Sequence, residues 1–416
     1  METVKKTTFS KGLVSKICCV IALICVGVVY IWSVMKGAAM EYYLWDEGPV
    51  NLISNFMLFG FCIGSFIGGF INDKISSKKT AIIGIVMFSV GFFLSSLIAP
   101  GAPIVLFYIT YCALSGIGSG FTFSAALSCL QKWMPHKRGL ASGLGAAGFA
   151  LGAVIFGPVI SAMLNTMSLA AALRILAIAT FVVGMIACLL IMMPSKEYLD
   201  SLPKPEVKAT SIASSKDYTF AEAIKTPLYW VFILSIFFYN ATWNMLTPLI
   251  KGIGMDRGLS EAVAITCVSL TGLFNACGRF SMSALSDKIG RMTTFKILAI
   301  GTAVFAGLLT FVPGGVYFAV VLLTAFFFGG PAAVNPATCT DLFGQKYSAT
   351  NYGCTLLALG VSSVVFGSIS NALYAATGTY TATFIVGGVS ALITLVLYII
   401  LTKMIKNKNA KEAKEN

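Results

Sequence analysis

One arginine, Arg279, lies within a long apolar stretch of the sequence, in residues 272–280. If this stretch crosses a membrane, the arginine must face a polar cavity or a partner, because a charge in hydrocarbon is costly. Asn275 precedes it by one helical turn and shares its face. No Asp or Glu lies near the middle of any apolar stretch, so the natural partner is a bound anion. A planar guanidinium can hold a carboxylate through two parallel hydrogen bonds.

A second interpretation of Arg279 stays open at this point. The side chain could extend to the lipid headgroups at the nearer end of its helix. Asp287 marks that end and lies eight residues further on, about 12 Å away at about 1.5 Å per residue. Anion binding and extension to the headgroups therefore both remain possible.

The composition decides what kind of protein holds this arginine. Of the 416 residues, 57% are hydrophobic and only 11% are charged, whereas a soluble domain has about 25% charged residues. The net charge of +13 does not indicate nucleic-acid binding, because the charges occur in short clusters between long apolar stretches. The eleven cysteines show no zinc-binding spacing, so we expect buried packing roles for them and no metal site.

Twelve stretches are long and apolar enough to cross a bilayer, which takes about 20 residues each. We therefore expect an all-α membrane protein. The first stretch is too long for a signal peptide and has no small-residue cleavage site. The predicted spans are residues 14–38, 49–71, 80–100, 104–131, 139–164, 169–193, 228–250, 260–284, 292–312, 314–338, 349–373 and 379–402.

The basic residues predict the orientation. Most of the 29 Lys and Arg fall in the termini and in alternate loops, which places them on one side of the membrane. The positive-inside rule then places both termini in the cytoplasm. We expect a multi-pass protein of the cell inner membrane.

The sequence also predicts two halves. Residues 194–227 form the one long polar stretch and indicate a cytoplasmic linker. The residues Asp73 and Lys74 recur as Asp287 and Lys288, and Gly139 recurs as Gly353 at the same offset. We therefore expect a six-helix half at 1–193, a second at 228–402, and a basic cytoplasmic tail at 403–416. Such halves can rock about a site near the middle of the membrane.

The repeated loops carry a family resemblance. Residues 69–79 resemble the cytoplasmic loop signature of the major facilitator superfamily, although Ser76 replaces its usual glycine; residues 287–291 keep that glycine as Gly290. The resemblance implies that acidic and basic side chains at these helix ends latch the halves together in one state. Ordinary anchoring by positive charges is the alternative. The implied latch residues are Asp73, Lys74, Arg138, Asp287, Lys288 and Arg291.

A narrower resemblance points to the oxalate/formate antiporter family, which is related to the monocarboxylate porters. Residues 132–143, 225–230, 286–291, 341–344 and 347–353 carry it. The family places its anion-binding arginine at Arg279. Proton-coupled porters have an aspartate where this chain has Asn275, and oxalate carriers have a lysine where it has Leu359.

The same resemblance implies the rest of a pocket. The aromatic positions of an oxalate-type pocket correspond to Tyr30, Phe123, Phe328 and Ala332, so we expect a larger and less polar cavity than one for oxalate. Asn335 is a further candidate from the sequence itself, because it lies between Pro331 and Pro336, where freed backbone groups can line a cavity.

These features favour a secondary transporter of small organic anions, most simply a monocarboxylate, by exchange. A proton-coupled monocarboxylate symporter is the alternative. A channel or an intramembrane enzyme is disfavoured, because no pore repeat and no His, Asp or Glu set lies in the membrane, and no nucleotide-binding loop is present. We expect a monomer in the lipid bilayer that needs no cofactor and binds no nucleic acid.

Overall fold

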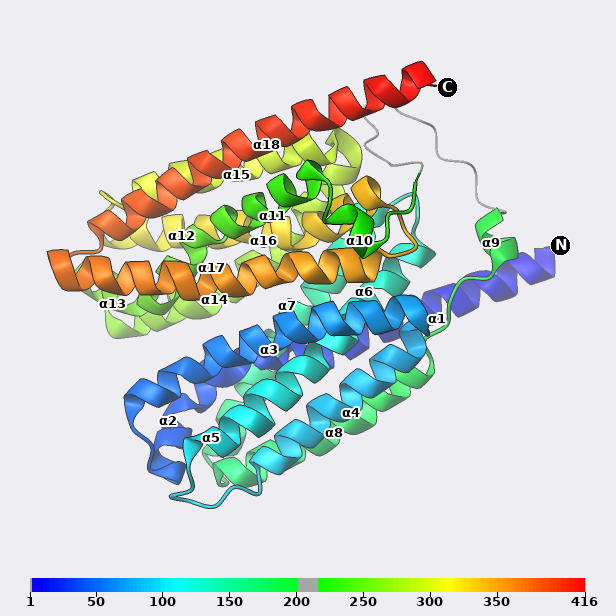
Figure 1. The fold of residues 1–416 in the computed structure, drawn as a ribbon. Helices are drawn as coiled ribbons and strands as arrows, with labels where there is room; N and C mark the ends of the chain where they lie inside the picture. Colours follow the sequence, from blue (N-terminus) through cyan, green and yellow to red (C-terminus); the bar gives the residue numbers. More distant parts are fainter. Residues whose placement is uncertain (1, 201–215, 416) are drawn as a thin grey trace. The chain divides into compact units, whose positions relative to one another are not determined.

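The computed structural model describes residues 2–200 and 216–415, and every regular element in this part of the chain is helical (Figure 1). The chain divides into two compact units. Unit 1 comprises Met1–Ala209 and Gln345–Leu357, and unit 2 comprises Thr210–Gly344 and Ala358–Asn416. Part of the predicted linker, residues 201–215, lies outside the described residues.

Unit 1 contains the helices of the first half. They are α1 (Glu2–Val26), the 3-10 segment η1 (Gly27–Ile31), α2 (Trp32–Tyr43), α3 (Glu47–Lys74), α4 (Ser77–Ser95), α5 (Ile104–Phe107), the π-helical segment η2 (Tyr108–Ser115), α6 (Gly116–Trp133), α7 (Arg138–Leu164), α8 (Leu169–Leu189) and α9 (Lys196–Asp200).

Unit 2 contains the helices of the second half. They are α10 (Phe220–Ala223), α11 (Pro227–Tyr239), α12 (Ala241–Leu246), the 3-10 segment η3 (Thr247–Leu249), α13 (Ile250–Asp256), α14 (Glu261–Ile289), α15 (Arg291–Leu308), α16 (Gly314–Phe343) and α18 (Thr381–Glu415). The remaining helix, α17 (Ser348–Thr377), begins in unit 1 and continues into unit 2.

Eleven described helices are long and apolar enough to cross a membrane. They correspond to the predicted spans except the seventh, residues 228–250, although the first span, 14–38, also runs over three elements, α1, η1 and α2. The seventh span is not one helix: it is divided among α11, α12, η3 and α13. Pro248 has no backbone N–H to continue the helical ladder at η3, and Asn240 separates α11 from α12. The all-helical, twelve-span architecture is otherwise confirmed.

Small residues let the helices of unit 1 approach closely. A Cβ atom on Gly120 of α6 would overlap the Phe61 carbonyl oxygen of α3, and one on Gly64 of α3 would overlap the backbone of Ile117. Membrane helices associate through such contacts, because lipid offers no hydrophobic drive between apolar faces. The glycines of the fourth predicted span therefore act in helix packing.

The helix ends on one face of unit 1 are tied together by hydrogen bonds. The Ser15 hydroxyl of α1 and the Trp133 indole of α6 both donate to the Met192 carbonyl oxygen after α8, at 2.8 and 2.7 Å. The start of the first spanning stretch, Lys11–Val29, and the ends of α6 and α8 therefore lie on the same side. This is the arrangement that six consecutive crossings require.

The short helix α10 begins unit 2 with a capping box. The Thr219 hydroxyl accepts from the Glu222 amide, and the Glu222 carboxylate accepts from the Thr219 amide at 2.8 Å. The Lys216 ammonium donates to the same carboxylate, and together these groups lower the pKa of Glu222 to about 2. The second half therefore begins at a well-defined helix start.

Candidate functional site

Arg279 is buried within unit 2, in the second half of α14. It is only 8% exposed, and its Nε atom donates to Oδ1 of Asn275 at 2.7 Å. Asn275 is also 8% exposed, and its Nδ2 atom donates to the Ala325 carbonyl oxygen of α16 at 3.4 Å. A chain of two hydrogen bonds thus fixes the guanidinium against two helices.

The sequence builds this position through two glycines. A Cβ atom on Gly278 would overlap the Phe326 carbonyl oxygen, and one on Gly329 would overlap the Asn275 carbonyl oxygen. Because both residues are glycine, α14 and α16 approach at backbone distance. This approach brings the Asn275 amide within reach of α16, and Asn275 in turn orients Arg279.

The bond to Asn275 bears on one of the two interpretations of Arg279, the extension to the headgroups. The side chain reaches one turn toward the N-terminal end of α14, as helical side chains tend to do. Asp287 marks the opposite end. Since Arg279 is buried and turned away from that end, it does not extend to the headgroups there. Its Nε atom is instead held on α14 by Asn275.

The other buried cation, Arg291, has its counter-charges within unit 2. Among the described side chains, Arg279 and Arg291 are the buried charged ones. Arg291 pairs through Nη1 with Asp287 Oδ1 at 2.6 Å and through Nε with Asp341 Oδ2 at 3.0 Å. It also donates to the Ser286 hydroxyl. This cluster joins the end of α14, the start of α15 and the end of α16.

Asp73 takes a different role from Asp287, its counterpart in the repeat. Its Oδ2 atom accepts from the Thr350 amide at 2.9 Å and from the Thr350 hydroxyl at 2.8 Å, and Asn72 donates to Oδ1 at 3.2 Å. Thr350 lies in the first turn of α17, where the amides have no partner within the helix. A carboxylate there also complements the helix dipole.

The remaining predicted latch residues are basic and lie at helix ends. The Lys74 ammonium lies 4.1 Å from the centroid of the Phe70 ring. Arg138 is the first residue of α7, and its carbonyl oxygen accepts from the Ser142 hydroxyl at 2.8 Å. Lys288 is exposed in the last turn of α14. Sequence reasoning missed Asp341 and Thr350 as partners, although both stand in quoted family segments.

The aromatic positions lie in separate units. Phe123 of unit 1 is 4% exposed and packs against Phe61 and Phe149, with ring centroids 5.2 and 5.1 Å away. Phe328 of unit 2 stacks on Trp243 of α12, with centroids 5.1 Å apart and planes at 17°. Tyr30 lies in η1, and its side chain is outside the described part of the structure.

Three further predicted residues lie in unit 2. Ala332 is half-buried on α16, one turn after Phe328, and Leu359 is half-buried on α17. Asn335 is 5% exposed, and its Oδ1 atom has no hydrogen-bond partner among the described residues. A buried amide oxygen without a partner indicates a place for water or another polar group.

The Pro331 break has a structural partner. Proline cannot donate to the Phe327 carbonyl oxygen one turn earlier, and the Tyr239 hydroxyl of α11 donates to that oxygen at 2.7 Å. Tyr239 also forms a hydrogen bond with Thr302 of α15 at 2.9 Å. Tyr239 therefore compensates the break and holds three helices of unit 2 together.

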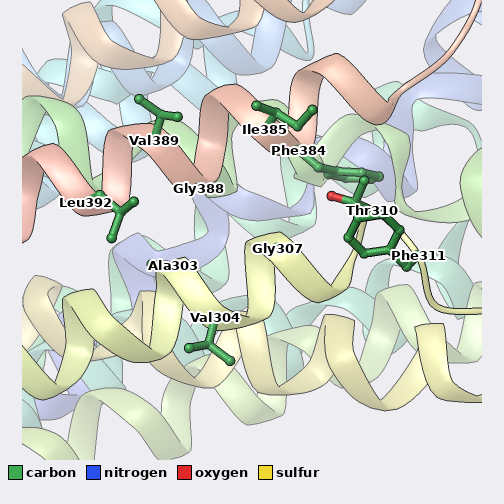
Figure 2. A pocket seen from close by; sticks show the side chains of 10 residues that line it. All are labelled: Ala303, Val304, Gly307, Thr310, Phe311, Phe384, Ile385, Gly388, Val389 and Leu392. Carbon is green, nitrogen blue, oxygen red and sulfur yellow. The ribbon is translucent and has the colours of Figure 1, made fainter.

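A groove between α15 and α18 is not a suitable anion site. It has a volume of about 440 Å³, and Figure 2 shows side chains from both helices along it. Its lining carries no charged side chain, and its one hydroxyl is that of Thr310. Such a surface fits apolar contacts rather than a carboxylate. The lining residues are Ala303, Val304, Gly307, Thr310, Phe311, Phe384, Ile385, Gly388, Val389 and Leu392.

Residues 17–367 match the family described as the Major Facilitator Superfamily. The chain belongs to the Major Facilitator Superfamily. It is a multi-pass membrane transporter rather than an enzyme, as the sequence predicted. Within this superfamily, the resemblance to oxalate/formate antiporters and monocarboxylate porters is confirmed by individual relatives.

Two relatives and one solved structure illustrate the similarity. The oxalate:formate antiporter of Oxalobacter formigenes is 30% identical over 335 residues, covering 79% of this chain and 77% of that protein. Monocarboxylate transporter 12 of Xenopus laevis is 25% identical, covering 83% of this chain and 79% of that protein. The crystal structure of the transporter FucP in the outward conformation has a TM-score of 0.69 at 15% identity, with 92% of this chain and 97% of that chain covered. That likeness supports the fold.

Proposed function

We propose that this transporter carries small organic anions, specifically monocarboxylates, by alternating access, and that it exchanges one anion for another. The observation that carries the proposal is Arg279, a buried guanidinium oriented at 2.7 Å by Asn275 inside unit 2. A fixed planar donor set recognises a carboxylate with little loss of conformational freedom. Relatives whose names specify formate, oxalate and monocarboxylate cargo support this substrate class.

The number of basic groups favours a single negative charge on the substrate. By resemblance, oxalate carriers have a second cation at the position of Leu359. This chain has a half-buried leucine there, which cannot pair with a second carboxylate. The second carboxylate of a dianion bound at Arg279 would therefore not be neutralised by residue 359, and burying that charge would cost considerable desolvation energy.

Asn275 favours exchange over proton symport. By resemblance, proton-coupled porters have an aspartate at this position, and the carboxamide of Asn275 does not titrate. Among the described side chains, none of the buried ones is Asp, Glu or His. Exchange needs no proton carrier, because a second anion is bound to Arg279 when the transporter changes back to its first state.

The remaining sequence predictions are part of the same proposal. Both termini lie in the cytoplasm of the cell inner membrane, the two halves move about the linker, and the protein works as a monomer. The loop residues Asp73, Lys74, Arg138, Asp287, Lys288 and Arg291 stabilise one state of the cycle. Asp73 would do so by capping α17, since it accepts two hydrogen bonds from Thr350.

Transport by purified protein in proteoliposomes tests the proposal. Radiolabelled acetate, formate, oxalate and malonate are offered to vesicles with and without the same anion inside. We expect uptake of monocarboxylates that is faster with internal anion and absent in an Arg279→Ala protein. Uptake of none of these anions by a folded wild-type protein would contradict the proposal.

A further inference from the structure

Trp243 differs from the other tryptophans in its hydrogen bonding. The chain has five tryptophans. Four donate their indole N–H to a backbone carbonyl oxygen: Trp32 to Val50, Trp45 to Ala102, Trp133 to Met192 and Trp230 to Ile224, at 3.2, 2.8, 2.7 and 2.7 Å. The indole N–H of Trp243 has no acceptor among the residues that the structure describes, and the side chain is only half-buried. Because a tryptophan N–H inside a protein normally finds a partner, this donor is available to a ligand.

The ring of Trp243 is held in place although its N–H is not. It stacks on Phe328 of α16, with centroids 5.1 Å apart and planes at 17°. It also packs against a buried apolar cluster that includes Leu246, Ile250 and Tyr317. The pair is therefore a preorganised flat apolar surface carrying one hydrogen-bond donor.

The backbone next to Phe328 lies against the backbone of Arg279. Phe328 is the chain neighbour of Gly329, and a Cβ atom on Gly329 would lie 3.2 Å from the Arg279 amide nitrogen. Consecutive Cα atoms are about 3.8 Å apart, so the Cα atom of Phe328 lies about that far from the Cα atom of Gly329. Residues 325 and 329 face α14. Residue 328 is turned about 100° from residue 329 and about 60° from residue 325, and its ring meets α12 through Trp243.

We propose that Trp243 and Phe328 form the apolar wall of the Arg279 site, and that the Trp243 indole N–H donates to an oxygen at the far end of the substrate. This inference rests on the proposed function of Arg279 as the carboxylate ligand. It names the substrate class as monocarboxylates with a flat conjugated body and an oxygen acceptor remote from the carboxylate, such as oxygen-substituted arenecarboxylates. Flat rings pack on the stacked pair, and the carboxylate binds the guanidinium.

The test separates the ring contact from the hydrogen bond. Wild type, Trp243→Phe and Trp243→Leu are compared in proteoliposomes with labelled acetate, 4-ethylbenzoate and 4-methoxybenzoate, the last two being close in size. Trp243→Phe keeps a ring but loses the donor. We expect this variant to reduce transport of 4-methoxybenzoate relative to transport of 4-ethylbenzoate by about three- to tenfold. Trp243→Leu should reduce transport of both arenecarboxylates relative to transport of acetate by about tenfold.

Trp230→Phe is the matched control, because Trp230 is 53% exposed and donates to Ile224 at the start of α11. It should leave all three ratios at the wild-type values. Wild type that carries acetate but neither arenecarboxylate, or a Trp243→Leu protein with wild-type ratios, would overturn this inference and leave the proposed function standing. Wild type that carries no carboxylate would instead contradict the proposed function itself.

Discussion

The Nε atom of Arg279 donates to Oδ1 of Asn275 across a single turn of α14, at 2.7 Å. This bond fixes the direction of the guanidinium, and the Asn275 amide is fixed in turn by the Ala325 carbonyl oxygen. We therefore expect transport to depend on the shape of the basic group and not only on its charge.

We expect Arg279→Lys to weaken monocarboxylate transport by about tenfold or more, because an ammonium cannot reproduce the planar fork or the bond to Asn275. Arg279→Ala should abolish transport. Initial exchange rates in proteoliposomes measure both effects, and size-exclusion profiles in detergent check folding. Arg174→Ala, at an exposed arginine on α8, should transport like wild type. A near-wild-type rate for Arg279→Ala would remove Arg279 from the site.

Leu359→Lys should shift preference toward dicarboxylates. A cation about 4 Å from a second carboxylate contributes up to about 4 kcal/mol at an effective dielectric of about 20. Desolvation removes most of this, and a shift of roughly two- to tenfold should remain. Competition between acetate and malonate measures it, with Leu359→Gln as the uncharged control. If both variants keep the wild-type preference, Leu359 does not line the pocket.

Much of the fold follows from the sequence, because the cost of exposing a backbone to lipid leaves few choices. Eleven of the predicted spans are long helices, and Arg279 stood out because charge inside an apolar stretch is costly. The division of the seventh span was missed. Its composition is apolar throughout, and the break depends on local backbone partners around Asn240 and Pro248.

Long-range pairing could not be obtained from sequence spacing. Asp73 and Asp287 occupy equivalent places in the repeat, yet Asp73 caps α17 while Asp287 pairs with Arg291. The neighbours of each carboxylate come from distant segments, so identical motifs acquire different contacts. The stack of Trp243 on Phe328 has the same origin, since residues on α12 and α16 meet only in the folded unit.

Arg291→Met should destabilise unit 2. The substitution leaves Asp287 and Asp341 close together without the guanidinium that now pairs with both at 2.6 and 3.0 Å. Arg291 is buried, and its two carboxylates are only 16% and 13% exposed. Removing one partner of a fully buried ion pair costs about 3–5 kcal/mol, so we expect a smaller but clear fall in the midpoint of thermal unfolding in detergent. Lys288→Met, at an exposed neighbour on α14, should change the midpoint little. Equal midpoints for the two variants would show that the cluster adds no stability.

Energy coupling should depend on the absence of a titrating group at position 275. In the wild type we expect internal anion to accelerate uptake more than an inward proton gradient does, since Asn275 cannot take up a proton. Asn275→Asp should reverse this behaviour. The new carboxylate would take the place of the amide oxygen that now accepts from Arg279. At neutral pH it would compete with the substrate for the guanidinium. Protonation would remove that competition, so uptake by the variant should be low near pH 7 and rise as the pH falls. The wild-type rate should respond much less over the same range.

Uptake is measured at fixed membrane potential, with and without preloaded anion, from about pH 5 to pH 8. Proton-driven accumulation by the wild type without stimulation by internal anion would contradict exchange, because it would require a proton carrier other than residue 275.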